Sequence, residues 1–163
     1  MPVKLLPIEQ ILTILKETPP RIAALTTGLA PAQLHAPPKL DEWSANEVLA
    51  HLRSCATVWG NYIAVIIAED MPAIRAVSPR AWIKGTDYLQ QGFQPAFKAF
   101  TKQRASLLSL LEQLAPEAWS RSATVTAVGK PILRTVHTYA ERLAVHEREH
   151  VRQIERIVNI VRV

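Results

Sequence analysis

Two histidines near the end of the chain, His146 and His150, are four residues apart. On an α-helix this spacing stacks the two side chains one turn apart on the same face, so both imidazoles can reach one point. Neutral imidazole is a common ligand of zinc, nickel, iron and copper. The pair therefore predicts two ligands of a divalent metal ion. The alternative is a pair of partly buried histidines that hydrogen-bond to Glu147 or Glu149.

A stable site needs a third ligand, and His51 is the candidate. It lies in a segment with helical spacing of its apolar residues, beside the apolar stripe rather than opposite it. The three imidazoles meet if this helix is a neighbour of the helix that carries the histidine pair. Such neutral ligands leave coordination positions for water, a thiolate or a substrate oxygen, which is typical of a catalytic metal.

Four other polar residues are expected to stay outside the chemistry. Cys55 is predicted to be a small core residue rather than a ligand or a nucleophile. Glu47 is expected to cap a helix instead of acting as a general base. His35, in a Pro-rich loop, and His137, on the far side of the last helix, are expected to face solvent.

Arginines and tryptophans near these motifs have ordinary explanations. Arg142 and Arg148 flank the first histidine of the pair and are expected to be solvated, with binding of an anionic substrate group as the alternative. The tryptophans are expected mostly to pack in the core, although they could also line a pocket. The four tryptophans are at positions 43, 59, 82 and 119.

The elements that must position the histidines are four amphipathic segments separated by stretches that contain Pro or Gly. Their apolar spacing predicts α-helices, and Ser44 with Glu47 has the spacing of a capping box at the start of the second helix. Pro19 and Pro20 are expected to kink the first helix near Thr18, or to restart it there with Thr18 as its cap. The four helices are expected at about 7–29, 44–69, 95–114 and 133–161.

The connections between these helices complete the predicted fold. Residues 70–92 form a long connection with a short helix around Trp82, and the segment ATVTAVGKPIL (123–133) predicts a small hairpin or extended loop. The sequence therefore predicts an all-α four-helix bundle. It has a long connection between helices 2 and 3 and a small extended loop before the last helix. Residues 1–163 are expected to form a single domain.

Composition and charge argue against several classes of protein. The chain has 48% hydrophobic and 20% charged residues, which is typical of a globular protein. The net charge of +5 comes from basic residues that are scattered and interleaved with acids, which makes nucleic acid an improbable partner. The longest apolar runs are too short to span a membrane. The first ten residues lack the features of a signal peptide, and one cysteine excludes an internal disulfide, so we expect a cytoplasmic protein.

Three stretches of the sequence resemble the DinB/YfiT-like superfamily of metalloenzymes. They are EWSANEVLAHL (42–52), LSLLEQLAPEAWSRSATV (108–125) and HEREHVRQI (146–154). The resemblance implies a four-helix bundle with a nickel or zinc ion held by His51, His146 and His150. Many relatives carry an acidic residue shortly after the first histidine, whereas in this chain His51 is followed by Leu52, Arg53 and Ser54. We therefore assign the role of that acidic residue to no residue of this chain.

The resemblance also implies a class of reaction. Superfamily members include thiol-dependent S-transferases. In such an enzyme the metal lowers the pKa of the thiol and holds the thiolate as a nucleophile. We therefore expect a metal-dependent S-transferase or hydrolase acting on a small molecule, with a low-molecular-weight thiol as one candidate partner. The alternative is a non-catalytic metal-binding or stress-related bundle that acts through a partner surface or as a homodimer. An anion or nucleic-acid binder is the third hypothesis.

Overall fold

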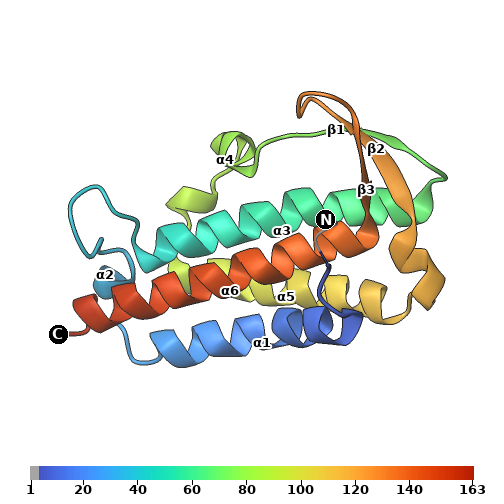
Figure 1. The fold of residues 1–163 in the computed structure, drawn as a ribbon. Helices are drawn as coiled ribbons and strands as arrows, with labels where there is room; N and C mark the ends of the chain where they lie inside the picture. Colours follow the sequence, from blue (N-terminus) through green and yellow to red (C-terminus); the bar gives the residue numbers. More distant parts are fainter. Residues whose placement is uncertain (1–3) are drawn as a thin grey trace.

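The computed structural model describes residues 4–163, and four long helices form most of it (Figure 1). These helices are α1 (Ile8–Thr26), α3 (Ala45–Ala68), α5 (Phe93–Glu112) and α6 (Val136–Val161). α6 packs against α1 and α3, and α5 packs against the same two helices, so the apolar faces of all four meet in one core. The predicted four-helix bundle is therefore confirmed.

The start of α3 has the predicted capping box. The Ser44 hydroxyl accepts a hydrogen bond from the Glu47 backbone N–H at 3.2 Å, and the Glu47 carboxylate accepts one from the Ser44 N–H at 3.1 Å. These two bonds satisfy backbone donors that have no partner within the helix. They also fix where α3 begins, and α3 ends at Ala68, close to the predicted limit.

Of the two expectations for the first helix, a restart capped by Thr18 was wrong, and a kink near Thr18 stays a prediction. α1 continues through Pro19 and Pro20, and Thr18 does not cap a new helix: its hydroxyl donates to the Ile14 carbonyl at 2.9 Å. Pro19 has no N–H to donate to the Leu15 carbonyl, as a helix would require. The guanidinium of Arg104 on α5 donates to that carbonyl instead, at 2.9 Å. A side chain from another helix thus compensates the lost bond.

The last helix begins three residues later than predicted. Leu133, expected to be helical, belongs to strand β3 (Ile132–Thr135), and Thr135 caps α6 in a capping box with Thr138. The Thr135 hydroxyl accepts from the Thr138 N–H at 3.0 Å, and the Thr135 N–H donates to the Thr138 hydroxyl at 2.8 Å. The third helix is also shifted, since α5 begins at Phe93 rather than Pro95. Helix ends depend on such local caps more than on apolar spacing.

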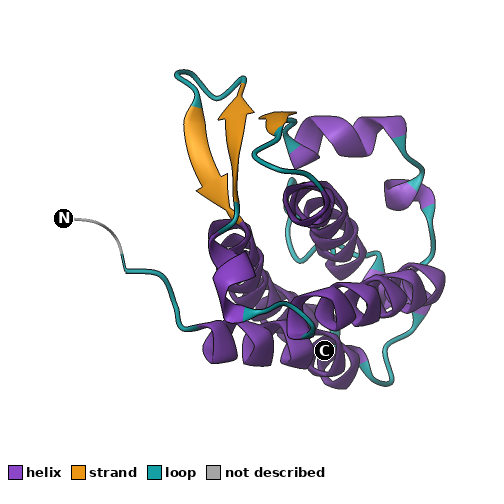
Figure 2. Ribbon diagram, turned by 90° about the vertical axis from the view of Figure 1, so that its right-hand side faces the viewer, coloured by secondary structure: helices purple, strands orange, loops and turns teal. Residues whose placement is uncertain are grey.

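A three-stranded sheet lies at the end of the bundle where α6 begins, on one side of the helices (Figures 1 and 2). β2 (Ser122–Thr126) and β3 form the predicted hairpin, with Val125 opposite Ile132. β1 (Ala73–Arg75), which the sequence did not predict, runs parallel to β2 and comes from the long connection between α3 and α5. The sheet therefore anchors the start of that connection.

The rest of the connection lies along α3. It contains the short helix α4 (Pro79–Trp82), as predicted around Trp82, followed by 3₁₀ turns at Ile83–Gly85 and Tyr88–Gln90. Arg53 of α3 holds the second turn, because its guanidinium lies 3.8 Å from the centre of the Tyr88 ring and donates to the Gln91 side chain at 2.9 Å. The connection is thereby fixed beside α3.

Two expectations concern the chain as a whole. None of the helices in residues 4–163 combines the length and the apolar character needed to cross a membrane. The predicted single domain of residues 1–163, and the segment expected not to be a signal peptide, both include residues 1–3, which lie outside the described part of the chain.

Candidate metal centre

The three predicted ligands lie together between α3 and α6. His51 Nε2 lies 3.1 Å from His146 Nε2, and His150 Nε2 lies 3.0 Å from the same atom. The ring centres of His51 and His150 are 4.9 Å apart. α3 and α6 are neighbours in the bundle, and this was the condition on which the third ligand depended. We refer to His51, His146 and His150 as the histidine cluster.

Hydrogen bonds within the protein cannot satisfy all the ring nitrogens of the cluster. His150 Nδ1 donates to the Gln153 side-chain oxygen at 2.7 Å, and in an uncharged ring this tautomer leaves a lone pair on Nε2. A single hydrogen on His146 Nε2 would then face the lone pairs of two histidines at once. His146 Nδ1 is buried and has no hydrogen-bond partner among residues 4–163. The cluster therefore lacks an acceptable set of partners of its own.

The surroundings keep two of these imidazoles neutral. Burial, followed by the neighbouring His150 and Arg80, lowers the pKa of His51 to about 4. Burial also lowers the pKa of His146 to about 3, with His150 and His51 as the next causes. Only a neutral imidazole has the lone pair that a metal ion requires. At neutral pH both rings are therefore ready to act as ligands.

The distances between the donor atoms fit one metal ion. Two imidazole nitrogens bonded at about 2.0–2.1 Å to a tetrahedral ion stand about 3.3 Å apart, and a thiolate stands about 3.5 Å from such a nitrogen. The nitrogen pairs above measure 3.1 and 3.0 Å. Cys55 Sγ lies 3.6 Å from His51 Nε2 and 4.0 Å from His146 Nε2. One donor atom each from His51, Cys55 and His146 lies within 4.8 Å of the other two.

Cys55 is both a core residue and a neighbour of the candidate ligands. It is buried in the core, as predicted for a small core residue, and burial raises the pKa of its thiol to about 12, with the Glu147 carboxylate as the next cause. Its sulfur nevertheless faces the same point as the histidines, four residues along α3 from His51. The spacing of His51 and Cys55 was the sequence signal for this contact.

Gln153 contacts a candidate ligand, and the sequence reasoning missed it. It follows His150 by three residues on α6 and accepts the hydrogen bond from its Nδ1. A partner of this kind orients a metal-binding imidazole and fixes which nitrogen faces the ion. The three-residue spacing on a helix was the available signal, since residues so placed are neighbours on the helix surface.

Two tryptophans enclose the histidine cluster. The Trp43 ring lies 5.1 Å from that of His51, and the Trp59 ring lies 5.2 Å from that of His146, centre to centre. Both tryptophans are half-buried, whereas Trp119 is a buried core residue as expected. The predicted packing role therefore fits Trp119, while Trp43 and Trp59 form apolar walls beside the candidate ligands.

Glu147 does not hydrogen-bond to the histidine pair, contrary to the alternative considered for the sequence. It is fully buried and forms a bidentate ion pair with Arg104 of α5. Successive residues of a helix point about 100° apart, so Glu147 faces α1 and α5 while His146 faces α3. Glu149 is exposed and pairs with Arg152 at 2.9 Å. Neither acid supplies the missing partner of the cluster.

The other candidates lie away from the cluster, and one expectation was wrong. His35 is exposed as predicted, but His137 is half-buried: its Nε2 lies 2.7 Å from the Leu6 carbonyl oxygen, and its ring packs edge-on against Trp119. Arg148 lies in a separate cavity with residues of α1. Arg142 is exposed, with its guanidinium carbon 5.7 Å from the centre of the Trp59 ring.

A cavity of about 220 Å³ opens beside His51, between α3 and the long connection. It is lined by side chains of α3, of α4 and of the two 3₁₀ turns, and we name it the Arg80 cavity. Its lining residues are Trp43, Glu47, His51, Arg80, Ile83, Lys84 and Leu89. The histidine cluster can therefore be reached from a defined pocket.

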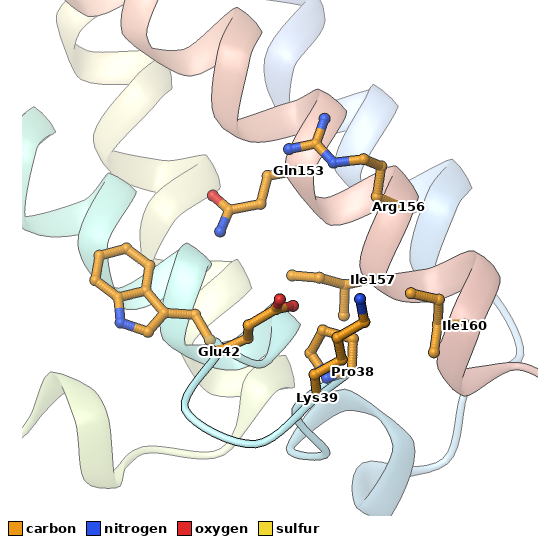
Figure 3. A pocket seen from close by; sticks show the side chains of 8 residues that line it. Pro38, Lys39, Glu42, Gln153, Arg156, Ile157 and Ile160 are labelled. Atoms are coloured by element: carbon orange, nitrogen blue, oxygen red, sulfur yellow. The ribbon is translucent and has the colours of Figure 1, made fainter.

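A second cavity, of about 450 Å³, lies on the other side of Trp43, and we name it the Gln153 groove (Figure 3). Figure 3 shows Gln153 and Arg156 of α6 on one side of it, and Glu42 on the other. None of the three histidines lines the groove, which is linked to the cluster through Gln153 and Trp43. The smaller Arg80 cavity is thus the one in direct contact with a candidate ligand.

Comparisons with known proteins agree with this architecture. The family model of the DinB superfamily matches residues 14–154, which is most of the chain. The structure is similar to that of YfiT from Bacillus subtilis, a probable metal-dependent hydrolase with an unusual four-helix bundle topology. The TM-score is 0.81 at 17% sequence identity, and the match covers 98% of this chain and 91% of that one. A search among curated proteins found no match.

Proposed function

The chain belongs to the DinB superfamily, and we propose that it is a metal-dependent enzyme acting on a small molecule through an ion held by His51, His146 and His150. One observation carries the proposal: the Nε2 atoms of His51 and His150 lie 3.1 and 3.0 Å from His146 Nε2, and the buried His146 Nδ1 has no hydrogen-bond partner among residues 4–163. A divalent cation would accept all three lone pairs at once. The neutral rings at physiological pH support the same assignment.

The donor set indicates which ions fit. Imidazole ligands suit zinc, nickel, iron and copper, and oxygen-preferring ions such as magnesium and calcium fit poorly. Cys55 Sγ, as a further donor within 4.0 Å of two of the nitrogens, would strengthen the preference for a soft or borderline ion. We propose nickel or zinc.

The reaction class follows from what such an ion supplies. When bound, it polarises an oxygen or sulfur atom and stabilises negative charge there, which suits hydrolysis or thiol transfer. The protein's own side chains hold and enclose this position. Gln153 orients His150, and Trp43 and Trp59 exclude water from two sides. The description of YfiT as a probable metal-dependent hydrolase supports hydrolysis as the reaction, and for thiol transfer the co-substrate would be a low-molecular-weight thiol.

Two further predictions from the sequence are not tested by the structure. We expect a cytoplasmic location, and a homodimer belongs to the alternative hypothesis of a bundle that acts through a partner surface. Both can be checked by fractionation of the cells that produce the protein and by light scattering of the purified chain.

The proposed function is tested by elemental analysis of untagged protein purified without added metal. We expect close to one nickel or zinc ion per chain in the parent. The His146→Ala, His150→Ala double variant should lose the ion, because it retains only one of the three imidazoles. His35→Ala serves as the matched control, since His35 is exposed and lines a cavity that contains no residue of the histidine cluster.

Two outcomes would contradict the metal-dependent function. The first is a parent protein that holds no ion even after incubation with nickel and zinc salts. The second is an equal metal content in the parent and the double variant, which would locate the ion elsewhere. In either case the histidine cluster would be a packing feature, and the non-catalytic hypothesis of a partner-binding bundle would take precedence.

A further inference from the structure

The charge around the Arg80 cavity is not balanced by the protein. Arg80 and Lys84 line the cavity, and neither forms an ion pair with an acidic side chain of residues 4–163. Glu47 is the one acid in the lining, and its carboxylate is already engaged by the Ser44 N–H. The lining therefore carries an excess of positive charge before any metal ion is added.

The position of Arg80 is fixed rather than incidental. α4 packs against α3, and the guanidinium carbon of Arg80 lies 5.1 Å from the centre of the Trp43 ring. Trp43 is itself 5.1 Å from His51, ring centre to ring centre. Stacking of a guanidinium on an aromatic ring limits its motion and leaves its edge free to donate hydrogen bonds. The Arg80 guanidinium is thus held against Trp43, which in turn contacts the candidate ligand His51.

The remaining walls of the cavity are apolar. Trp43, Ile83 and Leu89 provide them, and Leu89 is 44% exposed although it is a large hydrophobic side chain. The volume of about 220 Å³ is below the roughly 300–1,000 Å³ of pockets that hold drug-sized ligands. The cavity therefore suits a small molecule with an apolar body and one anionic group.

We propose that the Arg80 cavity binds the substrate as a small organic anion, a carboxylate whose apolar body lies against Trp43 and whose charge is held by Arg80 and Lys84. This inference rests on the proposed function, because it places that substrate beside the metal-binding histidines. A planar guanidinium matches a carboxylate with two parallel hydrogen bonds, which gives orientation as well as attraction. The substrate would thereby present its reactive atoms toward His51.

The Gln153 groove offers a contrast that helps the test. Its lining has the same set of charges, two basic side chains (Lys39 and Arg156) and one acid (Glu42), but no histidine of the cluster (Figure 3). A ligand that was attracted only by the overall basic charge of the protein would use either cavity. Arg156 is therefore the matched control for Arg80.

The experiment is calorimetric titration of zinc-loaded protein with phenylacetate and with its neutral analogue phenylacetamide. We expect the parent to bind phenylacetate about tenfold more tightly, as is typical of hydrogen bonds to a charged group. The Arg80→Gln, Lys84→Gln double variant should lose this preference, while Arg156→Gln should keep it. Both substituted residues of the double variant are exposed, so its fold and zinc content should match those of the parent.

The outcomes separate this inference from the proposed function. Equal binding of the two probes by the parent, or a preference that survives in the double variant, would overturn the carboxylate assignment while the metal site stands. Loss of the preference in Arg156→Gln would overturn it in favour of the Gln153 groove. Absence of bound zinc would contradict the proposed function, and the same titration of the metal-free protein would still decide whether Arg80 and Lys84 hold the anion.

Discussion

Two groups of polar side chains meet at α6, and they differ in whether the groups that face one another are complementary. The Glu147 carboxylate receives both of its hydrogen bonds from Arg104, which also donates to the Leu15 carbonyl, although the buried Arg104 Nε has no partner among residues 4–163. The neighbouring His146 faces two other imidazoles and has a buried Nδ1 with no partner in the described chain. A buried polar group without a partner costs free energy of folding.

The difference indicates separate roles for adjacent residues. The ion pair of Arg104 and Glu147 has opposite charges in contact, and it joins α5 to α6 and to α1. The histidine cluster gathers like groups that do not complement one another, an arrangement that is costly unless a ligand completes it. We therefore interpret the first group as part of the fold and the second as a binding site.

The largest expected effect comes from breaking the ion pair. Arg104→Met leaves the fully buried Glu147 without its cation, and the free energy of unfolding should fall by about 3–5 kcal/mol. Urea denaturation of the metal-free protein measures this loss. The Arg104→Met, Glu147→Leu double variant is the control, and it should recover most of the stability because no charge remains buried. A loss of less than about 1 kcal/mol in the single variant would contradict a structural role.

A smaller effect is expected when acid charges the histidine cluster. The pKa values of about 4 for His51 and about 3 for His146 lie below the ordinary value of 6.5. As the pH falls below 6.5 the unfolded chain binds protons that the folded protein does not, so the metal-free protein loses stability until the pH reaches the folded values. Partial exposure of His146 moderates the effect.

This pH dependence can be assigned to the cluster with a variant. Urea denaturation of the metal-free protein at a series of pH values should give a stability that declines between pH 6.5 and about 4. The His51→Gln, His146→Gln double variant should decline less steeply, because two of the titrating groups are gone. The same slope in both proteins would show that other groups cause the decline.

The next effect concerns the orientation of His150. Gln153→Ala removes the acceptor of the His150 Nδ1 hydrogen bond and should weaken zinc binding about 10- to 100-fold, with the fold unchanged. Competition with a chromophoric chelator measures the affinity. Gln113→Ala is the control, because Gln113 is exposed at the end of α5. An unchanged affinity in Gln153→Ala would mean that this bond does not position a ligand.

The smallest expected change in affinity is that of Cys55→Ala. The cobalt-loaded parent should show a near-ultraviolet sulfur-to-metal absorption band, because a thiol that contacts the ion loses its proton and binds as a thiolate. The variant should lose the band, while its affinity changes by less than about tenfold because the three histidines remain. A parent spectrum without the band would leave Cys55 as the core residue predicted from the sequence.

The sequence predicted local features whose causes are local. The capping box of Ser44 and Glu47 and the apolar spacing of α3 need only residues within a few positions of one another, and both are confirmed. The predicted restart of the first helix at Thr18 was wrong, because a contact between residues far apart in the chain accommodates Pro19. The carbonyl that Pro19 leaves free on Leu15 finds its donor in Arg104, which lies 89 residues further along the chain.

The candidate site was predictable to the extent that it uses a helical repeat. The four-residue spacing of His146 and His150 placed them on one face of a helix, His51 was the candidate third ligand from its place beside an apolar stripe, and the resemblance to a metalloenzyme superfamily supported it. Gln153 and Cys55 also stand at helical spacings from these ligands, but many polar residues do so without making a contact. Nothing in the sequence around Arg80 indicated that it lies beside the site, because its position depends on how the long connection packs against α3.

By itself, the sequence determined four amphipathic helices, the cap of α3, and a histidine pair on one face of the last helix. These features are set by the backbone period and by bonds between residues near in sequence. Only the tertiary structure decided that His51 meets that pair, that Glu147 turns away to Arg104, and that Arg80 lines the cavity. Each of these contacts joins residues more than 25 positions apart. Such contacts depend on which helices pack against one another in the bundle, and local spacing in the sequence does not determine that packing.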